Sequence, residues 1–243
     1  MLVKFHWQDY SDKGYLDALK VLQQMCHEGS IITLGLCNFD SIRTDEICTE
    51  LGSGGIVSNQ VQFSIIDVRP LHGMNQVCEK HNLKLLTYGT LCGGFLSDRW
   101  LNAPEPDMYS GKLNPSQRKY LDMILQAWGD WSLFQTLLDT LRKIGDRHGG
   151  VSISNVAVRW VLDHPFVGAV IIGERHLDSI VVILFKGMLE GARMGLSNHM
   201  EDNLKAFGFS LTQEDKDSIE AVLIQSKSRM MITTIGDCGA EYR

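Results

Sequence analysis

Long apolar runs are missing from this sequence. The longest fully apolar stretch, Ile180 to Phe185, is far shorter than the roughly 20 residues that a helix needs to cross a bilayer. The first ten residues, MLVKFHWQDY, lack the apolar core of a signal peptide. We therefore expect a cytoplasmic protein that has no membrane partner.

Paired cysteines are also missing. The six cysteines are scattered at positions 26, 37, 48, 78, 92 and 238, and no two of them form a CxxC pair. Several lie inside apolar stretches. This pattern predicts reduced, buried thiols, and it argues against a disulfide framework or a zinc site.

Positive charge is in deficit. The chain has 23 Lys and Arg against 29 Asp and Glu, which gives a net charge of -6 and a pI near 5.7. Nucleic acid and anionic membranes both favour a basic face, so neither is expected as the main partner. With 243 residues, 44% hydrophobic and 21% charged, the chain is long enough for one large globular domain with a substantial core.

What the sequence does contain is an alternation of apolar strands and amphipathic helices, which is typical of parallel β/α units. Both an open doubly wound sheet and a (β/α)8 barrel share this pattern. A GxGxxG motif follows none of the strands, which weakens the case for a dinucleotide-binding doubly wound sheet. The strands are expected within residues 2–5, 31–37, 56–63, the start of 83–96, and 167–172.

Polar side chains stand where these strands end. His6, Asn38, Gln60 and Tyr88 each lie at or just after a predicted carboxyl end. In a barrel, several strands contribute one residue each to a single site at that face. For His6 or Asn38 alone, an ordinary strand-end or turn residue is the simpler interpretation, so the pattern of all four carries the argument.

The stretch LKLLTYGTLCGGFL at residues 83–96 is the centre of the sequence. A short apolar strand leads into a loop with three glycines, which let the backbone bend sharply or approach a ligand closely. Glycines that merely turn the chain at a strand end are the simpler alternative. Beyond this stretch, residues 99–150 carry three prolines and two helical patterns, and we interpret them as a helical insertion on the loop side of a strand.

Five motifs in order carry a resemblance to a known family. FHWQDY, LGLCNF, SNQVQFSIID, LLTYGTLCGG and VIIG resemble successive segments of the aldo-keto reductases, and the likeness covers nearly all of residues 1–243 as a single domain. The resemblance implies a (β/α)8 TIM barrel that binds NADP(H) in extended form. It also implies an oxidoreductase that reduces a small-molecule aldehyde or ketone to an alcohol.

The resemblance assigns roles to individual residues. His6 matches the histidine that orients the substrate carbonyl, and Tyr88 matches the aromatic ring on which the nicotinamide stacks. Asn38 and Gln60 match the side chains that hydrogen-bond the nicotinamide carboxamide. Cys37 stands where the family usually has a serine, and a thiol is a weaker hydrogen bonder. Gly89, Thr90 and Leu91 begin the loop that passes the pyrophosphate.

The sequence departs from the family in what it lacks. About five of the eight βα units are present, and the family's first three strands, which carry its catalytic aspartate, tyrosine and lysine, have no counterpart. We therefore expect an incomplete, N-terminally truncated barrel whose carbonyl reduction is weak or absent, because reduction needs a positioned acid. The alternatives are a non-catalytic NADP-binding regulatory or interaction protein, and a non-functional fragment.

Residues 174–191 interrupt the family pattern. Without them the chain would read VIIGARMGLSNHMEDN, which resembles the family's turn and helix around the 2′-phosphate and adenine. We hypothesise that this anomalous insertion is translated non-coding sequence or an error in the gene model. By position, Arg193 would pair with the 2′-phosphate, and His199 and Asn203 would flank the adenine. If the insertion is genuine, Arg175 competes with Arg193.

Overall fold

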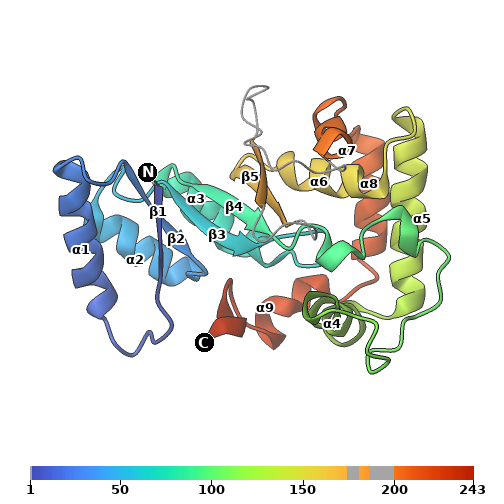
Figure 1. Ribbon diagram of the computed structural model, residues 1–243, viewed down its shortest axis with the longest axis horizontal. Helices are drawn as coiled ribbons and strands as arrows, with labels where there is room; N and C mark the ends of the chain where they lie inside the picture. Colours follow the sequence, from blue (N-terminus) through green and yellow to red (C-terminus); the bar gives the residue numbers. More distant parts are fainter. Residues whose placement is uncertain (1, 174–180, 186–199) are drawn as a thin grey trace.

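The structure of the chain is a computed structural model that describes residues 2–173, 181–185 and 200–243. The described residues form one six-stranded sheet in the order β1-β2-β3-β4-β5-β6, with helices beside it (Figure 1). Strands β1 to β5 run parallel, and β6 pairs antiparallel with β5. The strands are β1 Leu2–His6, β2 Thr33–Cys37, β3 Ser58–Gln62, β4 Lys84–Tyr88, β5 Val167–Gly173 and β6 Val181–Phe185.

Helices connect the strands in the order that the periodicity predicts. A π-helical segment, Met123–Trp128, continues α4. The α-helices are α1 Gly14–His27, α2 Ser41–Leu51, α3 Met74–His81, α4 Pro115–Asp122, α5 Trp131–Arg147, α6 Ile153–Leu162, α7 Met200–Leu204, α8 Gln213–Leu223 and α9 Met231–Thr234. Short 3-10 helices lie at Arg69–Leu71, Cys92–Gly94, Asp98–Trp100, Lys205–Phe207, Ser228–Met230 and Ala240–Tyr242.

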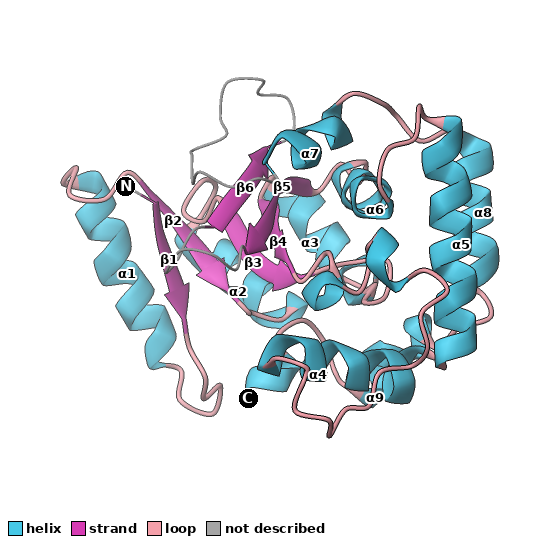
Figure 2. Ribbon diagram, turned by 45° about the vertical axis from the view of Figure 1, so that its right-hand side comes forward, coloured by secondary structure: helices cyan, strands magenta, loops and turns pink. Residues whose placement is uncertain are grey.

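Alternate residues of β1, β2 and β3 point to opposite faces of the sheet. Leu34, Leu36 and Val61 are almost completely buried in a core with the apolar faces of α1 to α3. Residues two apart in a strand point to the same side, and Lys4 on β1 donates a hydrogen bond to Gln60 on β3. Lys4, His6 and Gln60 therefore share the face of the sheet that the helices leave open (Figure 2).

The fold confirms a parallel five-stranded β/α sheet and adds one strand that the sequence analysis did not predict. Strand β6 falls within residues 174–191, where we expected an anomalous insertion. It covers the free edge of β5, because an apolar run rich in β-branched residues pairs readily with an open strand. The remaining residues of that segment, 174–180 and 186–191, lie outside the described part of the chain.

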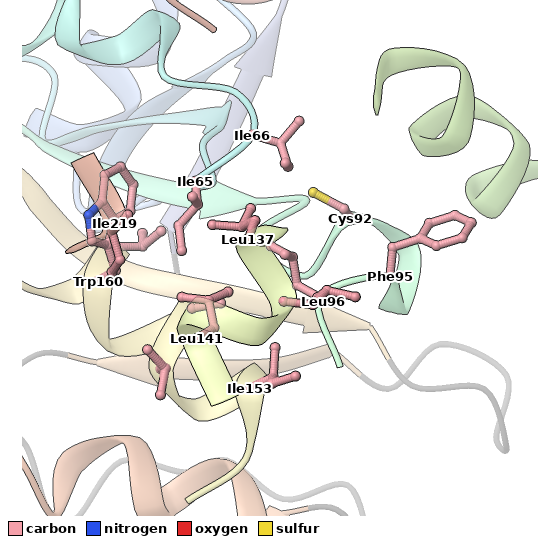
Figure 3. Packing of buried hydrophobic residues seen from close by; sticks show 14 of the residues in the cluster. Ile65, Ile66, Cys92, Phe95, Leu96, Leu137, Leu141, Ile153, Trp160 and Ile219 are labelled. Atoms are coloured by element: carbon pink, nitrogen blue, oxygen red, sulfur yellow. The ribbon is translucent and has the colours of Figure 1, made fainter. Parts of the chain in front are cut away.

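The predicted helical insertion at residues 99–150 is part of the core. Phe134, Leu137, Leu138 and Leu141 of α5 are completely buried in the larger hydrophobic cluster, which also contains Trp160 of α6. Figure 3 shows Leu137 and Leu141 packed among residues of α6, α8 and the loop that follows β4. Removing this segment would therefore leave α6 and α8 without the partner that buries them.

Helix α6 resolves an ambiguity left by the sequence, in which either Ser152 or Ser154 could cap it. The Ser152 hydroxyl accepts a hydrogen bond from the Asn155 backbone N–H and is the N-cap. The Ser154 hydroxyl instead donates to the carbonyl of Leu96, over 2.8 Å. Ser152 thus caps the helix, and Ser154 fixes its first turn to the loop after β4.

The cysteines follow the prediction in part. All six are free thiols; Cys48, Cys78, Cys92 and Cys238 are buried, whereas Cys26 and Cys37 are half-buried. Burial raises the pKa of Cys48, Cys78 and Cys92 to about 12, so these thiols stay protonated. Within the described ranges, no helix combines the length and apolar character needed to cross a membrane.

Asp215 at the start of α8 is a buried charge that links α8 to α5. Its carboxylate accepts hydrogen bonds from Arg147, over 2.5 Å, from His148, over 2.7 Å, and from the Thr212 backbone N–H. Burial alone would raise the pKa of Asp215, but the bonds from His148 and Arg147 outweigh burial and hold the pKa well below its ordinary value. The ionised form therefore stabilises the fold.

Replacing this carboxylate by Asp215→Asn is expected to lower the free energy of unfolding by about 2 kcal/mol at pH 7. Because the folded-state pKa is depressed, the carboxylate's contribution is complete above the unfolded-state pKa of about 3.9 and is lost as the pH falls towards the folded-state pKa. Urea unfolding at a series of acidic pH values is the measurement. The difference in free energy of unfolding between variant and wild type should shrink as the pH falls. The control is Asp139→Asn, whose side chain is 54% exposed. A difference that does not change with pH would contradict this assignment.

Candidate functional site

The site begins as a row of side chains across three strands. His6, Cys37 and Gln60 are successive partners in the parallel register of β1, β2 and β3. Neighbouring strands lie about 4.8 Å apart and partnered residues point to the same side. The structure thus brings together three residues that are far apart in the sequence, at the open face of the sheet.

Asn38 and Tyr88 join this row from the ends of β2 and β4. The backbone of Asn38 takes a left-handed conformation (φ 59°), and its N–H donates to the carbonyl of Gln60 over 2.9 Å. The Tyr88 hydroxyl donates to Asn38 Oδ1, also over 2.9 Å. Asparagine tolerates this backbone conformation better than most residues. The contact fixes the amide orientation of Asn38.

The ring of Tyr88 is half-buried, and no aromatic side chain of the described ranges stacks on it. Its hydroxyl lies 3.2 Å from the hydroxyl of Tyr242, which accepts a hydrogen bond from Lys119 Nζ over 2.9 Å. Burial, followed by the hydrogen bond to Tyr242, raises the pKa of Tyr88 far above its ordinary value. Tyr88 is therefore a neutral ring and a poor acid.

The side-chain amide oxygen of Gln60 already accepts a hydrogen bond within the chain. Lys4 Nζ donates to Gln60 Oε1 over 2.5 Å. Neither Gln60 Nε2 nor Asn38 Nδ2 donates to any residue in the part of the chain that the structure describes, so both N–H₂ groups remain for a ligand acceptor. Burial raises the pKa of the neighbouring Cys37 thiol, which stays protonated and a weak hydrogen bonder.

The glycine loop after β4 is shaped by α4. Gly89 has φ 71°, and a Cβ at this position would lie 2.2 Å from the Tyr120 hydroxyl, so only glycine fits. Thr90 is buried, and its hydroxyl donates to the carbonyl of Phe63 over 3.0 Å. Leu91 packs against the larger hydrophobic core. Because the side chains of Thr90 and Leu91 turn inward, this loop can offer a ligand mainly its backbone.

Three residues of the site were missed by the sequence analysis. Lys4 could have been found, since it stands two residues before His6 and therefore shares its face of β1. Lys119 and Tyr242 had no such signal, because they come from α4 and from the end of the chain, and only the tertiary structure places them beside Tyr88.

The residues predicted to contact the 2′-phosphate and the adenine do not lie beside Asn38, Gln60 and Tyr88 in the described structure. Arg193 and His199 lie outside the described residues, as does their competitor Arg175. Asn203 belongs to α7, which contacts α6 and lies at the top of both views, whereas the C-terminus lies near the bottom (Figures 1 and 2). The structure therefore brings Asn38, Gln60 and Tyr88 together without Asn203.

A cavity of about 290 Å³ lies in the predicted insertion, away from this row. None of its lining residues belongs to the site just described. They are Arg99, Trp100, Pro106, Asp107, Ser110, Lys112, Leu113 and Gln117. Among the residues that the structure describes, no cluster of His, Cys, Asp and Glu side chains could hold a metal ion.

Comparison with known proteins gives a family-model match at residues 2–187, to the aldo/keto reductase family. Flagellar radial spoke protein 5 of Chlamydomonas reinhardtii is 30% identical over 180 residues, which cover 67% of this chain and 33% of that protein. Pyridoxal reductase, chloroplastic, of Arabidopsis thaliana is 23% identical over 234 residues, which cover 94% of this chain and 54% of that protein.

Solved structures show the same architecture. The glycerol dehydrogenase of Gluconobacter oxydans matches with a TM-score of 0.67 and 23% identity, covering 92% of this chain and 58% of that one. An aldo-keto reductase of Bacillus halodurans matches with a TM-score of 0.60 and 19% identity, covering 91% and 60%. At such identities the likeness shows the fold, and it confirms the predicted fold class. The chain spans between one third and three fifths of the length of these proteins.

Proposed function

The chain belongs to the aldo/keto reductase family, and from this premise we propose that its site binds the nicotinamide of NADP(H) beside a small aldehyde or ketone. One observation carries the proposal. The row of His6, Cys37 and Gln60 meets the Asn38–Tyr88 contact at the carboxyl ends of adjacent parallel strands. This is where α/β barrels place their ligands. Nicotinamide cofactors are general in the family, and the phosphorylated form is our proposal.

The residues present fit a nicotinamide. A carboxamide offers one acceptor and two donors, and the unengaged N–H₂ groups of Asn38 and Gln60 supply donors for its oxygen. Tyr88 offers a neutral ring that is free of aromatic partners among the described residues. A ring stacked there would keep its other face open. When bound, the cofactor supplies or accepts the hydride.

His6 is the residue we propose for the substrate carbonyl. It is exposed at the end of β1, in register with Cys37. An imidazole N–H in that position can donate a hydrogen bond to a carbonyl oxygen and orient it. The pyrophosphate would pass the backbone of Gly89, Thr90 and Leu91. For the 2′-phosphate and the adenine we keep Arg193, His199 and Asn203 as the proposed contacts.

A second candidate is a non-catalytic protein that binds NADP(H) for regulation or interaction. One observation favours it. A relative with 30% identity is named a flagellar radial spoke protein. Both candidates share the nicotinamide site and differ in turnover, so a single set of measurements separates them.

Titration of the purified 243-residue chain with NADPH is expected to change the cofactor's fluorescence saturably, whereas turnover of simple aldehydes and ketones should be very low. A positioned general acid contributes about 10²- to 10⁴-fold to rate, and we expect a deficit of that size relative to ordinary reductases. Circular dichroism during heating is the control, because a non-functional fragment would show no cooperative melting. Absence of NADPH binding by a cooperatively folded chain would contradict the proposed function, and rapid turnover would contradict the second candidate.

A further inference from the structure

The last eight residues, Gly236 to Arg243, lie at the end of the sheet to which the arrowhead of β1 points (Figures 1 and 2). This segment, which we call the C-terminal clamp, contacts residues that follow β1, β2 and β3, and Tyr88 at the end of β4. Neither the sequence analysis nor the family resemblance gave it a role. Among its contacts are an anchor and two contacts with the proposed nicotinamide site, and Arg243 also lies over the ring of Tyr10 and pairs with Asp40.

The anchor is a buried ion-pair network. Arg69 is 1% exposed and donates to both carboxylate oxygens of Glu241, over 2.9 and 3.1 Å, and to those of Asp67, over 2.9 and 2.7 Å. Burial alone would raise the pKa of Glu241, but Arg69 outweighs it and holds the pKa below its ordinary value. At the other end of the clamp, the backbone N–H of Ser41 donates to Asp237 over 2.8 Å. The clamp is thus fixed at both ends.

The first contact on the site is with the backbone of Asn38. Arg243 donates to the Asn38 carbonyl over 2.9 Å and to the Cys238 carbonyl over 2.7 Å. A Cβ at Gly239 would lie 2.1 Å from the same Asn38 carbonyl, so the clamp can approach this closely only with glycine. Asn38 has a left-handed backbone, which persists when surrounding contacts over-determine it.

The second contact is with Tyr88. Tyr242 lies between the Tyr88 hydroxyl, 3.2 Å away, and Lys119 Nζ, 2.9 Å away. The Tyr88 hydroxyl has one hydrogen, which it donates to Asn38 Oδ1. The Tyr88 oxygen therefore accepts a hydrogen bond from the Tyr242 hydroxyl, and the Tyr242 oxygen accepts one from Lys119 Nζ. A directed chain of hydrogen bonds therefore runs from Lys119 through Tyr242 and Tyr88 to Asn38.

We propose that the C-terminal clamp positions Asn38 and Tyr88 for the nicotinamide, with Arg243 and Gly239 setting the Asn38 backbone and Tyr242 setting the Tyr88 hydroxyl. The identity of the ligand, a nicotinamide, rests on the proposed function. The contacts between the clamp and residues Asn38 and Tyr88 do not depend on it. These are positioning residues, because they reach the cofactor only through Asn38 and Tyr88. The clamp thus joins the end of the chain to the loop after β2.

The test uses Arg243→Met, with Arg243→Lys as the conservative variant. The matched control is Arg229→Met, which removes an exposed arginine of the C-terminal region that pairs with Glu220 on α8. Hydrogen exchange followed by mass spectrometry reports on residues 37–44 without any cofactor. Fluorescence titration reports NADPH affinity, and competition with 2′,5′-ADP, which lacks the nicotinamide, reports the adenosine end alone.

Arg243→Met is expected to speed exchange in residues 37–44 and to weaken NADPH about tenfold, a loss of about 1.4 kcal/mol. Affinity for 2′,5′-ADP should be unchanged, Arg243→Lys should recover part of the loss, and Arg229→Met should resemble wild type. Unchanged exchange, or equal weakening of NADPH and 2′,5′-ADP, would overturn the inference. Faster exchange in a chain that binds no NADPH would support the clamp and overturn the proposed function.

Discussion

Replacing the buried Arg69 by methionine is expected to lower the free energy of unfolding by about 3 to 5 kcal/mol. Arg69 is 1% exposed and its partner Asp67 is completely buried. Without the guanidinium, the carboxylate of Asp67 would keep two hydrogen bonds among the described residues, from Gln62 Nε2, over 2.8 Å, and from the backbone N–H of residue 69. A buried charge that loses its counter-ion costs far more than the intact pair contributes.

The loss should extend to the C-terminal clamp, because Arg69 also holds Glu241 and the carbonyls of Gly236 and Asp237. Urea unfolding is the measurement, and Arg118→Met, at an exposed position of α4, is the control. The double variant Arg69→Met with Asp67→Asn should recover part of the stability, since it removes the unpaired charge. A single variant that unfolds at the same urea concentration as wild type would show that the network contributes little.

Replacing Tyr88 by alanine is expected to weaken NADPH binding by about 10- to 100-fold, because stacking of a heteroaromatic base on an aromatic side chain contributes about 1 to 3 kcal/mol. The variant also removes the hydroxyl that donates to Asn38, so it disturbs the carboxamide contact. Tyr88→Phe keeps the ring and loses only the hydroxyl, and we expect it to weaken NADPH by no more than about fivefold.

Fluorescence titration with NADPH checks both variants, and thermal melting establishes that each one is folded. Tyr109→Ala is the matched control, because Tyr109 is 92% exposed and lies in the loop before α4. If Tyr88→Ala and Tyr88→Phe bind NADPH equally well, the ring makes no stacking contact. In that case the nicotinamide would have to bind elsewhere than on Tyr88.

The position of Lys4 gives the site a charge that the family resemblance did not anticipate. Its ammonium is held against Gln60 Oε1, and no carboxylate of the described residues forms an ion pair with it. The lysine occupies one acceptor position of the Gln60 amide oxygen and leaves the N–H₂ group of Gln60 for a ligand. The amide orientation of Gln60 is thus fixed from β1, across the intervening strand β2.

Much of the fold and part of the site could be predicted from the sequence because they depend on short-range patterns. Apolar runs with helical stretches between them predicted the five parallel strands, and a strand's carboxyl end is visible as the point where apolar residues give way to polar ones. Parallel pairing then brings such ends together whatever the loops do, so His6, Cys37, Asn38, Gln60 and Tyr88 could be grouped without coordinates. The glycine at position 89 was visible as a turn signal.

Contacts between segments remote in the chain were decided only by the tertiary structure. Strand β6 was not predicted, since an apolar run has no fixed conformation until a free strand edge pairs with it. Lys119 and Tyr242 are 123 residues apart, and nothing local to either one indicates the other. Likewise Arg69 and Glu241, 172 residues apart, become a buried ion pair only when the end of the chain folds over the loop after β3. The sequence by itself determined the five parallel strands and the polar residues at their ends. Packing determined which charges and hydroxyls surround those residues, because side-chain contacts depend on the whole chain being in place.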